Sequence, residues 1–249
     1  MAHSQCGEAA WKQIIRDTVN GISMSKSAEA LALTPNTVFN MRHKILLALE
    51  YQELHNPTSL GVVCELDDTF VLESYKGTKL PENFWRKPRK HGAVAQKPGI
   101  SNEYICINTG VSRVGEAFSK TVTRATPSKD DVKTVFEGRI EDETLVLCDG
   151  AKGYGDLGVI NNCDVVIVKE KKGFVHTNTA NSFHSFIKER YNQYRGVATK
   201  YLNRYNALFS KAYRNAEGLI SEVYCLLRKN DAPRHHSVSD VKDLNLLEI

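Results

Sequence analysis

The sequence has no hydrophobic run that approaches the roughly 20 apolar residues of a membrane-spanning helix. Its first residues, MAHSQCGEAAWK, contain neither the basic nor the apolar region of a secretory signal. It has no internal repeat and no low-complexity tract. With 41% hydrophobic and 25% charged residues, it does not have the composition of a disordered, collagen-like or coiled-coil protein. These absences predict a globular, cytoplasmic protein whose 249 residues can bury one large core or two small ones.

Paired cysteines are also missing. The six cysteines are scattered along the chain, and none forms the C-x-x-C pair typical of zinc sites. Four of them lie in stretches rich in Val, Ile and Leu, which predicts buried, reduced thiols and no zinc. The formal net charge is only +4, so a nucleic-acid partner is indicated only where positive charges are clustered.

Residues 8–50 follow a helical pattern with two breaks. The first helix is predicted to stop at Asn20-Gly21, and Thr34-Pro35 has the residues of a helix N-cap and first turn. The outer face of the helix that begins there would carry amide and cationic side chains: Asn36, Asn40, Arg42, His43 and Lys44. This pattern predicts a helix-turn-helix domain over residues 1–55 that binds DNA in the major groove. An ordinary three-helix bundle with a polar outer face would give the same pattern, and both interpretations stay open.

Strands and helices alternate from about residue 61 onwards. Helices are predicted over SKDDVKTVFEGRI, 178–194 and 198–227, and a turn from Gly110 to Gly115. Strands are predicted in GVVCELDDTFVLESY, EYICINTGV, KTVTRAT, ETLVLCDGAKGY and CDVVIVKE. This order predicts an α/β domain with a mixed sheet over residues 60–230. Residues 231–249 are polar and are expected to form a loose tail.

A basic segment with Pro and Gly and no periodicity interrupts this pattern at residues 76–99. It contains a single Glu among many cations, and it predicts an exposed loop that is long for a compact domain. Its cations could follow a phosphate backbone while Phe84 and Trp85 stack on bases. The residues expected to contact DNA are Arg86, Lys87, Arg89 and Lys90. A merely solvated loop is the alternative.

Two aspartates are candidates for a metal site. Asp67 lies within the first predicted strand, and Asp149 ends another strand just before a glycine. Ligands gather at the carboxyl ends of strands in α/β sheets, and a divalent cation would relieve the repulsion between two carboxylates. Mg²⁺ prefers such oxygen ligands, with Mn²⁺ as a possible substitute. A strand-end aspartate is also an ordinary turn residue.

The helix predicted from residue 178 supplies further polar groups. Its aromatic and aliphatic residues fall on one side, so Asn181 and Lys188 would project together from the opposite side. Arg195 would continue that line and contact DNA if the helix extended so far. An amide oxygen can bind Mg²⁺, and a lysine can hold a phosphate. A solvated polar face would look the same.

The chain resembles the DDE-type transposases of bacterial insertion sequences, in the ISXO-like branch. The resemblance covers nearly the whole chain and is carried by NGISMSKSAEALALTPNTVFNMRHKIL, ELDDTFV, VLCDGAKGY and NTANSFHSFIKERYNQYRGVATKYLNRY. It implies an RNase H-like core flanked by helices. It also implies Mg²⁺-dependent cleavage and joining of double-stranded DNA at the inverted-repeat ends of an element and at a target. The expected protein is a homo-oligomer on the DNA of a bacterial nucleoid, with no membrane partner.

The same resemblance implies which residues are catalytic. It places the acidic metal ligands on Asp67 and Asp149, and the third metal ligand on Asn181, where many relatives have Glu. Lys188 follows seven positions later and completes the catalytic set. Alternation along the strand puts Asp68 on the opposite face, whereas Glu65 shares the face of Asp67 and is not excluded by alternation alone.

The sequence departs from the family pattern in two ways. Family members often have a cysteine-rich zinc ribbon before the helix-turn-helix, so a truncated copy or a shorter form is expected. The neutral side chain of Asn181 predicts weaker metal binding than Glu would give. Two other functions stay open: a catalytically weak or inactive copy that only binds DNA ends as a repressor, and a nuclease that cuts DNA without joining it.

Overall fold

The computed structural model describes residues 5–80, 82–84, 89, 94–150, 153–170 and 172–229. The tail predicted at 231–249 and three of the loop cations, Arg86, Lys87 and Lys90, lie outside these residues. Among the helices of the described part, none is long and apolar enough to cross a membrane.

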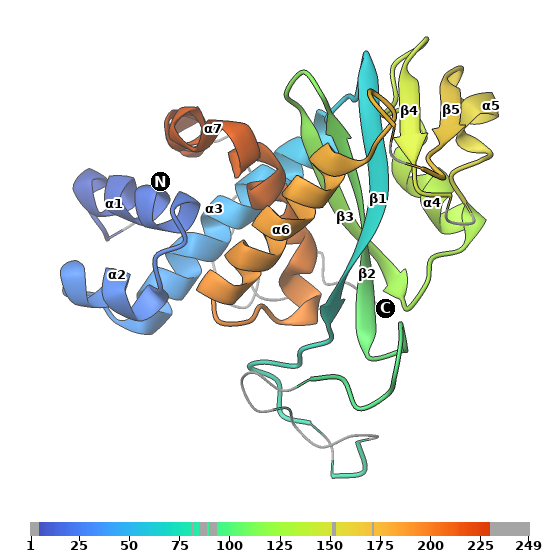
Figure 1. The fold of residues 1–249 in the computed structure, drawn as a ribbon. Helices are drawn as coiled ribbons and strands as arrows, with labels where there is room; N and C mark the ends of the chain where they lie inside the picture. Colours follow the sequence, from blue (N-terminus) through green and yellow to red (C-terminus); the bar gives the residue numbers. More distant parts are fainter. Residues whose placement is uncertain are drawn as a thin grey trace.

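A mixed sheet with the strand order β3-β2-β1-β4-β5 forms the centre of the structure (Figure 1). β1 pairs antiparallel with β2, and β2 pairs antiparallel with β3. β4 is parallel to β1, and β5 is parallel to β4. The strands are β1 (Val63–Leu72), β2 (Tyr104–Ser112), β3 (Ala117–Arg124), β4 (Leu145–Cys148) and β5 (Asp164–Ile167).

Helices cover both faces of this sheet (Figure 1). One face packs against α4 (Lys129–Phe136) and α5 (Leu157–Asn161) through a core that includes Leu66, Phe136 and Tyr154. On the other face lie α6 and α7, with the N-terminal helices beyond them. Their bounds are α1 (Glu8–Val19), α2 (Met24–Ala30), α3 (Pro35–His55), α6 (Asn178–Gln193), the 3₁₀ turn η1 (Thr199–Tyr201) and α7 (Leu202–Lys229). The predicted α/β class, with a mixed sheet flanked by helices after a helical N-terminal region, is confirmed.

Local sequence signals explain several element ends. The side chain of Thr34 caps α3 with Pro35 in its first turn, and Ser128 forms a capping box with Asp131 at the start of α4. The turn predicted to begin at Gly110 is displaced, because β2 continues through Gly110 to Ser112. Gly110 is a strand residue without room for a side chain, since a Cβ there would collide with Leu60.

The N-terminal helices share one hydrophobic core with the rest of the chain. Residues of α1 and α3, such as Trp11 and Ile45, pack in the same cluster as Ile107 of β2, Phe183 of α6 and Phe209 of α7. The helices of residues 1–55 therefore pack extensively against residues 60–230. The division into two domains at this boundary stays a prediction.

Burial by α7 and η1 corrects part of the prediction for α3. Arg42 and His43, expected on the outer face, are each 1% exposed. Arg42 donates a hydrogen bond to the carbonyl of Ile22, and the ring of His43 packs against Phe39 and Tyr201. The expected exposure of these two side chains is wrong because a later segment of the chain covers that side of α3.

The other predicted positions on α3 keep some access to solvent. Asn36 and Lys44 are exposed, and Asn40 is partly buried. The three residues are spaced four apart, so they form one stripe along the helix.

The cysteines are free thiols, as predicted. Cys64, Cys106 and Cys148 are buried in the structure. Cys6 and Cys163 are partly buried and Cys225 is exposed, so the expected burial holds for three of the six thiols.

Candidate active site

The central strand β1 presents carboxylates to both faces of the sheet. Glu65 and Asp67 contact residues of α6, whereas Asp68 contacts the opposite layer. The carboxylate of Asp68 accepts a hydrogen bond from the hydroxyl of Tyr154 at 2.5 Å and another from the amide of Asn108. The predicted alternation along the strand is therefore confirmed.

The hydrogen bonds of Glu65 separate its role from that of Asp67. Glu65 is fully buried, and one carboxylate oxygen accepts from the backbone amides of Thr179 (2.7 Å) and Ala180 (3.0 Å) at the start of α6. The other oxygen accepts from Nε of Arg113 at 2.8 Å and from the Thr179 hydroxyl at 3.0 Å. Because these bonds occupy both oxygens, Glu65 anchors α6, and Asp67 remains as the carboxylate of this face that can accept an ion.

Asp67 is a carboxylate in a low-dielectric environment beside other charges. Its pKa is raised to about 6, mainly by burial and in smaller part by the charges of Asp149 and Asp68. A hydrogen bond from the Asp68 amide, at 2.8 Å, and the charge of Lys188 act in the opposite direction. A bound cation would stabilise the ionised form of Asp67.

Asp149 lies beside Asp67 because of the strand register. Leu66 of β1 pairs with Cys148 of β4, so Asp67 and Asp149 occupy the next position on two neighbouring parallel strands. Such strands are about 4.8 Å apart. Asp149 is exposed, and its charge raises the pKa of Asp67. The structure therefore brings together the two aspartates that are 82 positions apart in the sequence.

One face of α6 places three polar side chains along this edge of the sheet. Asn181, His184 and Lys188 are spaced three and four residues apart, so they form one stripe on the helix. Asn181 and Lys188 are exposed, as predicted, whereas Phe183, His184, Ile187 and Tyr191 are buried on the neighbouring face of the helix. Lys188 lies close enough to lower the pKa of Asp67.

Arg195 does not continue this stripe. The helix ends at Gln193, and Arg195 has a φ of 54° in the turn that follows. Its side chain is exposed, and its carbonyl accepts a hydrogen bond from Lys76. The expected continuation of the helical line was wrong because the chain reverses direction at Arg195-Gly196 on its way to η1.

His184 is a site residue that the sequence reasoning missed. Its Nδ1 lies 3.7 Å from Oδ2 of Asp67, and its Nε2 lies 2.7 Å from the hydroxyl of Thr109. Burial lowers the pKa of His184 to about 4, and the charge of Lys188 contributes, so the ring is neutral at pH 7. A signal existed in the sequence, since His184 lies between Asn181 and Lys188 at helical spacing.

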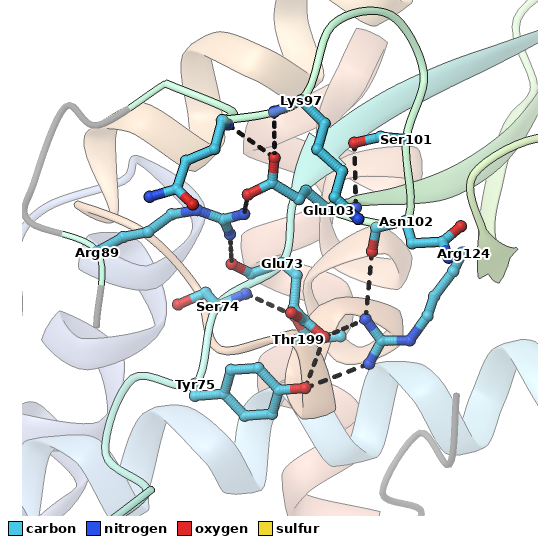
Figure 2. A network of polar contacts seen from close by, with 11 residues as sticks. Glu73, Ser74, Tyr75, Arg89, Lys97, Ser101, Asn102, Glu103, Arg124 and Thr199 are labelled. Carbon is cyan, nitrogen blue, oxygen red and sulfur yellow. Dashed lines mark hydrogen bonds and ion pairs between the residues drawn. The ribbon is translucent and has the colours of Figure 1, made fainter. Parts of the chain in front are cut away.

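A network of buried ion pairs fixes both ends of the basic loop (Figure 2). The guanidinium of Arg89 donates to the carbonyl of Glu73 and to the carboxylate of Glu103, and this carboxylate also accepts from the amide of Lys97. Arg124 of β3 pairs with the carboxylate of Glu73. Arg89, predicted to contact DNA, is thus bound within the protein and holds the loop to the ends of β1 and β2.

The donor set fits a divalent cation that keeps positions for water and phosphate. Asp67 lies near the charge of Asp149 and 3.7 Å from the imidazole of His184, and Asn181 shares the exposed stripe of α6. Carboxylate, amide and imidazole groups of this kind can bind Mg²⁺ or Mn²⁺. No cluster of three His, Cys, Asp or Glu side chains that could hold an ion occurs in the described part of the chain.

A family model places this site in context. The model of the ISXO2-like transposase domain matches residues 63–214, more than half of the chain. The chain belongs to this family. The matched segment of this transposase-family protein contains Asp67, Asp149, Asn181 and Lys188, whereas α1 to α3 precede it. The mixed five-stranded sheet with helices on both faces agrees with the core that the family resemblance implies.

Solved structures of a transposase show weaker similarity. A pre-cleavage Mos1 transpososome matches 94% of this chain and 82% of its own chain, with 10% identity and a TM-score of 0.31. A Mos1 transposase paired-end complex with the left transposon end matches 90% and 81%, with 11% identity and the same TM-score. These TM-scores are too low to indicate a shared fold by themselves. No curated protein sequence matches the chain significantly.

Proposed function

We propose that the protein is a metal-dependent DNA transposase of a bacterial insertion sequence that cleaves the element ends and joins them to target DNA. The observation that supports this most is the meeting of Asp67 and Asp149 on neighbouring strands, beside the polar stripe of α6. Family membership supports phosphoryl transfer in general, and these residues supply a specific place for it.

The ion would be held by Asp67 and Asp149, with the amide oxygen of Asn181 as a neutral third ligand. When bound, a divalent cation neutralises charge on the scissile phosphate and favours ionisation of the attacking water or 3′-hydroxyl. Lys188 is placed to hold a phosphate oxygen as negative charge develops. Glu65 keeps α6 in position for both tasks through its bonds to Thr179 and Ala180.

DNA would be bound by surfaces on either side of this edge. On the N-terminal helices, the stripe of Asn36, Asn40 and Lys44 offers amide and cationic groups. In a helix-turn-helix, α3 would be the recognition helix that lies in the major groove. The loop cations Arg86, Lys87 and Lys90 and the exposed Arg195 would follow the phosphate backbone. A homo-oligomer would bring two element ends together, and a protein that acts on bacterial nucleoid DNA works in the cytoplasm.

A cleavage and joining assay tests this function. The substrate is a plasmid that carries the gene for this chain with its flanking DNA, incubated with Mg²⁺ or Mn²⁺. We expect nicks at the element ends and joined products for the wild type. Asp67→Asn and Asp149→Asn should lose both products and keep DNA binding, whereas the adjacent control Asp68→Asn should keep cleavage.

The same assay separates the alternatives. DNA-end binding without any metal-dependent nick in the wild type would favour a repressor. Hydrolysis of the ends without joined products would favour a nuclease. Cleavage that survives Asp67→Asn or Asp149→Asn would exclude the assigned site.

A further inference from the structure

His184 has one ring nitrogen whose hydrogen-bond role is fixed by its neighbours. The hydroxyl of Thr109 donates its single hydrogen to the carbonyl of Asp67 at 2.8 Å. The same oxygen must therefore accept from Nε2 of His184, which lies 2.7 Å away. This assignment of the tautomer follows from the hydrogen-bond network.

The other ring nitrogen then carries a lone pair that faces a carboxylate. In the neutral ring, Nδ1 is an acceptor, and it lies 3.7 Å from Oδ2 of Asp67, which is too long for a hydrogen bond. The side chain of His184 is only 9% exposed, and no hydrogen bond to Nδ1 occurs among the described residues. Two electron-pair donors thus face each other across a gap at a site next to Asp149, and a cation would satisfy both.

The gap has the size that a shared ion can bridge. Neighbouring ligands of an octahedral ion with bonds of about 2.1 Å lie about 3.0 Å apart, so a side-chain shift of less than about 1 Å from the present 3.7 Å would let one ion bind both groups. Histidines that bind metals usually donate their second ring N–H to an acceptor that fixes the ring. The bond from Nε2 to Thr109 is such a support, and Thr109 is itself tied to the backbone of Asp67.

We propose that His184 is a metal ligand, and that Nδ1 of His184 and the carboxylate of Asp67 together select a divalent transition-metal ion such as Mn²⁺ over Mg²⁺. Imidazole nitrogen binds first-row transition ions better than Mg²⁺, which prefers oxygen. A nitrogen ligand would also restore part of the metal affinity that the site lacks because the side chain of Asn181 carries no negative charge. The ion itself belongs to the proposed function, so the test must separate ligation from catalysis.

Electron spin-echo envelope modulation of the full chain loaded with Mn²⁺ provides that test. We expect modulation from a directly bound imidazole ¹⁴N in the wild type, and a changed pattern when the histidines are labelled with ¹⁵N. His184→Gln should lose the modulation and weaken Mn²⁺ binding about tenfold while Mg²⁺ binding changes little. His176→Gln is the matched control, because His176 lies beside Glu65 and should leave the signal intact.

The outcomes distinguish this ligand from the catalytic function. Mn²⁺ that binds to the wild type without nitrogen modulation, or modulation that survives His184→Gln, would overturn the ligand even if DNA is cleaved. Modulation that depends on both His184 and Asp67, in a protein that does not cleave DNA, would support the ligand and exclude the transposase activity. If His184→Gln fails to fold, the absence of nitrogen modulation in the wild type still overturns the ligand, and loss of the modulation in Asp67→Asn supports the shared ion.

Discussion

The carboxylate of Glu65, in the middle of the sheet, accepts a hydrogen bond of 2.7 Å from the backbone amide of Thr179, 114 positions later in the chain. Ala180 donates to the same oxygen at 3.0 Å. This contact ties the first turn of α6 to β1 at a position two residues before Asp67. The position of Asn181 and His184 relative to Asp67 therefore depends on a buried carboxylate that lies outside the proposed metal site.

Removal of this charge should destabilise the protein and loosen the metal site. Glu65→Gln replaces an acceptor oxygen with a donor in a fully buried place, and Arg113 loses its charged partner. We expect the free energy of unfolding in urea to fall by about 2–4 kcal/mol. The control Asp156→Asn breaks an exposed pair with Lys129 and should cost less than about 1 kcal/mol. Equal effects of the two substitutions would contradict the anchoring role of Glu65.

Lys188 should act on the chemical step more than on folding. Its side chain is exposed, yet it lies close enough to Asp67 for its positive charge to lower the pKa of that carboxyl group. We expect Lys188→Met to lower the single-turnover rate of end cleavage roughly 100-fold, as loss of one electrostatic donor does, and Lys188→Arg to retain more of it. The exposed Lys133 of α4, on the other face of the sheet, supplies the control Lys133→Met. A similar rate for Lys188→Met and Lys133→Met would remove Lys188 from the site.

The residues of α3 should divide into two groups. Asn36→Ala and Lys44→Ala remove exposed side chains, so we expect weaker DNA binding with an unchanged melting temperature. For Lys44→Ala, the slope of log K against log salt should decrease by about 1, because one phosphate contact is lost. His43→Ala should lower the melting temperature, since His43 is buried between Phe39 and Tyr201. Unchanged DNA binding by both surface variants would exclude this stripe as a DNA contact.

Glu50 should make the protein less stable at alkaline pH. Burial raises its pKa from 4.5 to about 7 even though Arg204 lies 3.6 Å away. A raised pKa favours the protonated form in the folded state, so its contribution to stability is complete below pH 4.5 and is lost as the pH rises through 7.

A comparison with Glu50→Gln measures this contribution. The variant cannot ionise at this position, so its stability should change less with pH. From pH 5 to 8.5, the wild type should lose on the order of 2–3 kcal/mol relative to the variant. Urea unfolding at the two pH values measures the difference, and parallel stability curves for the two proteins would show that Glu50 ionises normally.

The sequence alone was sufficient for most of the elements. The Thr34-Pro35 helix start, the helix that begins at SKDD and the strand around Asp67 are local signals, and each of these elements forms in the predicted segment. The apolar face of α6 also follows from spacing, because a helix of 3.6 residues per turn must bury Phe183, Ile187 and Tyr191 together.

Contacts between distant segments decided the rest. Whether Glu65 or Asp67 faces an ion depends on α6, and the burial of Arg42 and His43 depends on α7 and η1. Periodicity along a single segment contains no information on which later segment covers it.

What the sequence by itself determined is the order of strands and helices and the pair Asp67 and Asp149 as candidate ligands, because these follow from local pattern and from residue chemistry. The tertiary structure alone decided that β4 lies parallel to β1, in the register that places Asp67 and Asp149 side by side. It also decided that His184 turns its Nδ1 towards Asp67. The physical reason is that burial and electrostatic coupling act through space, so they arise only when the folded sheet brings distant residues within a few ångströms.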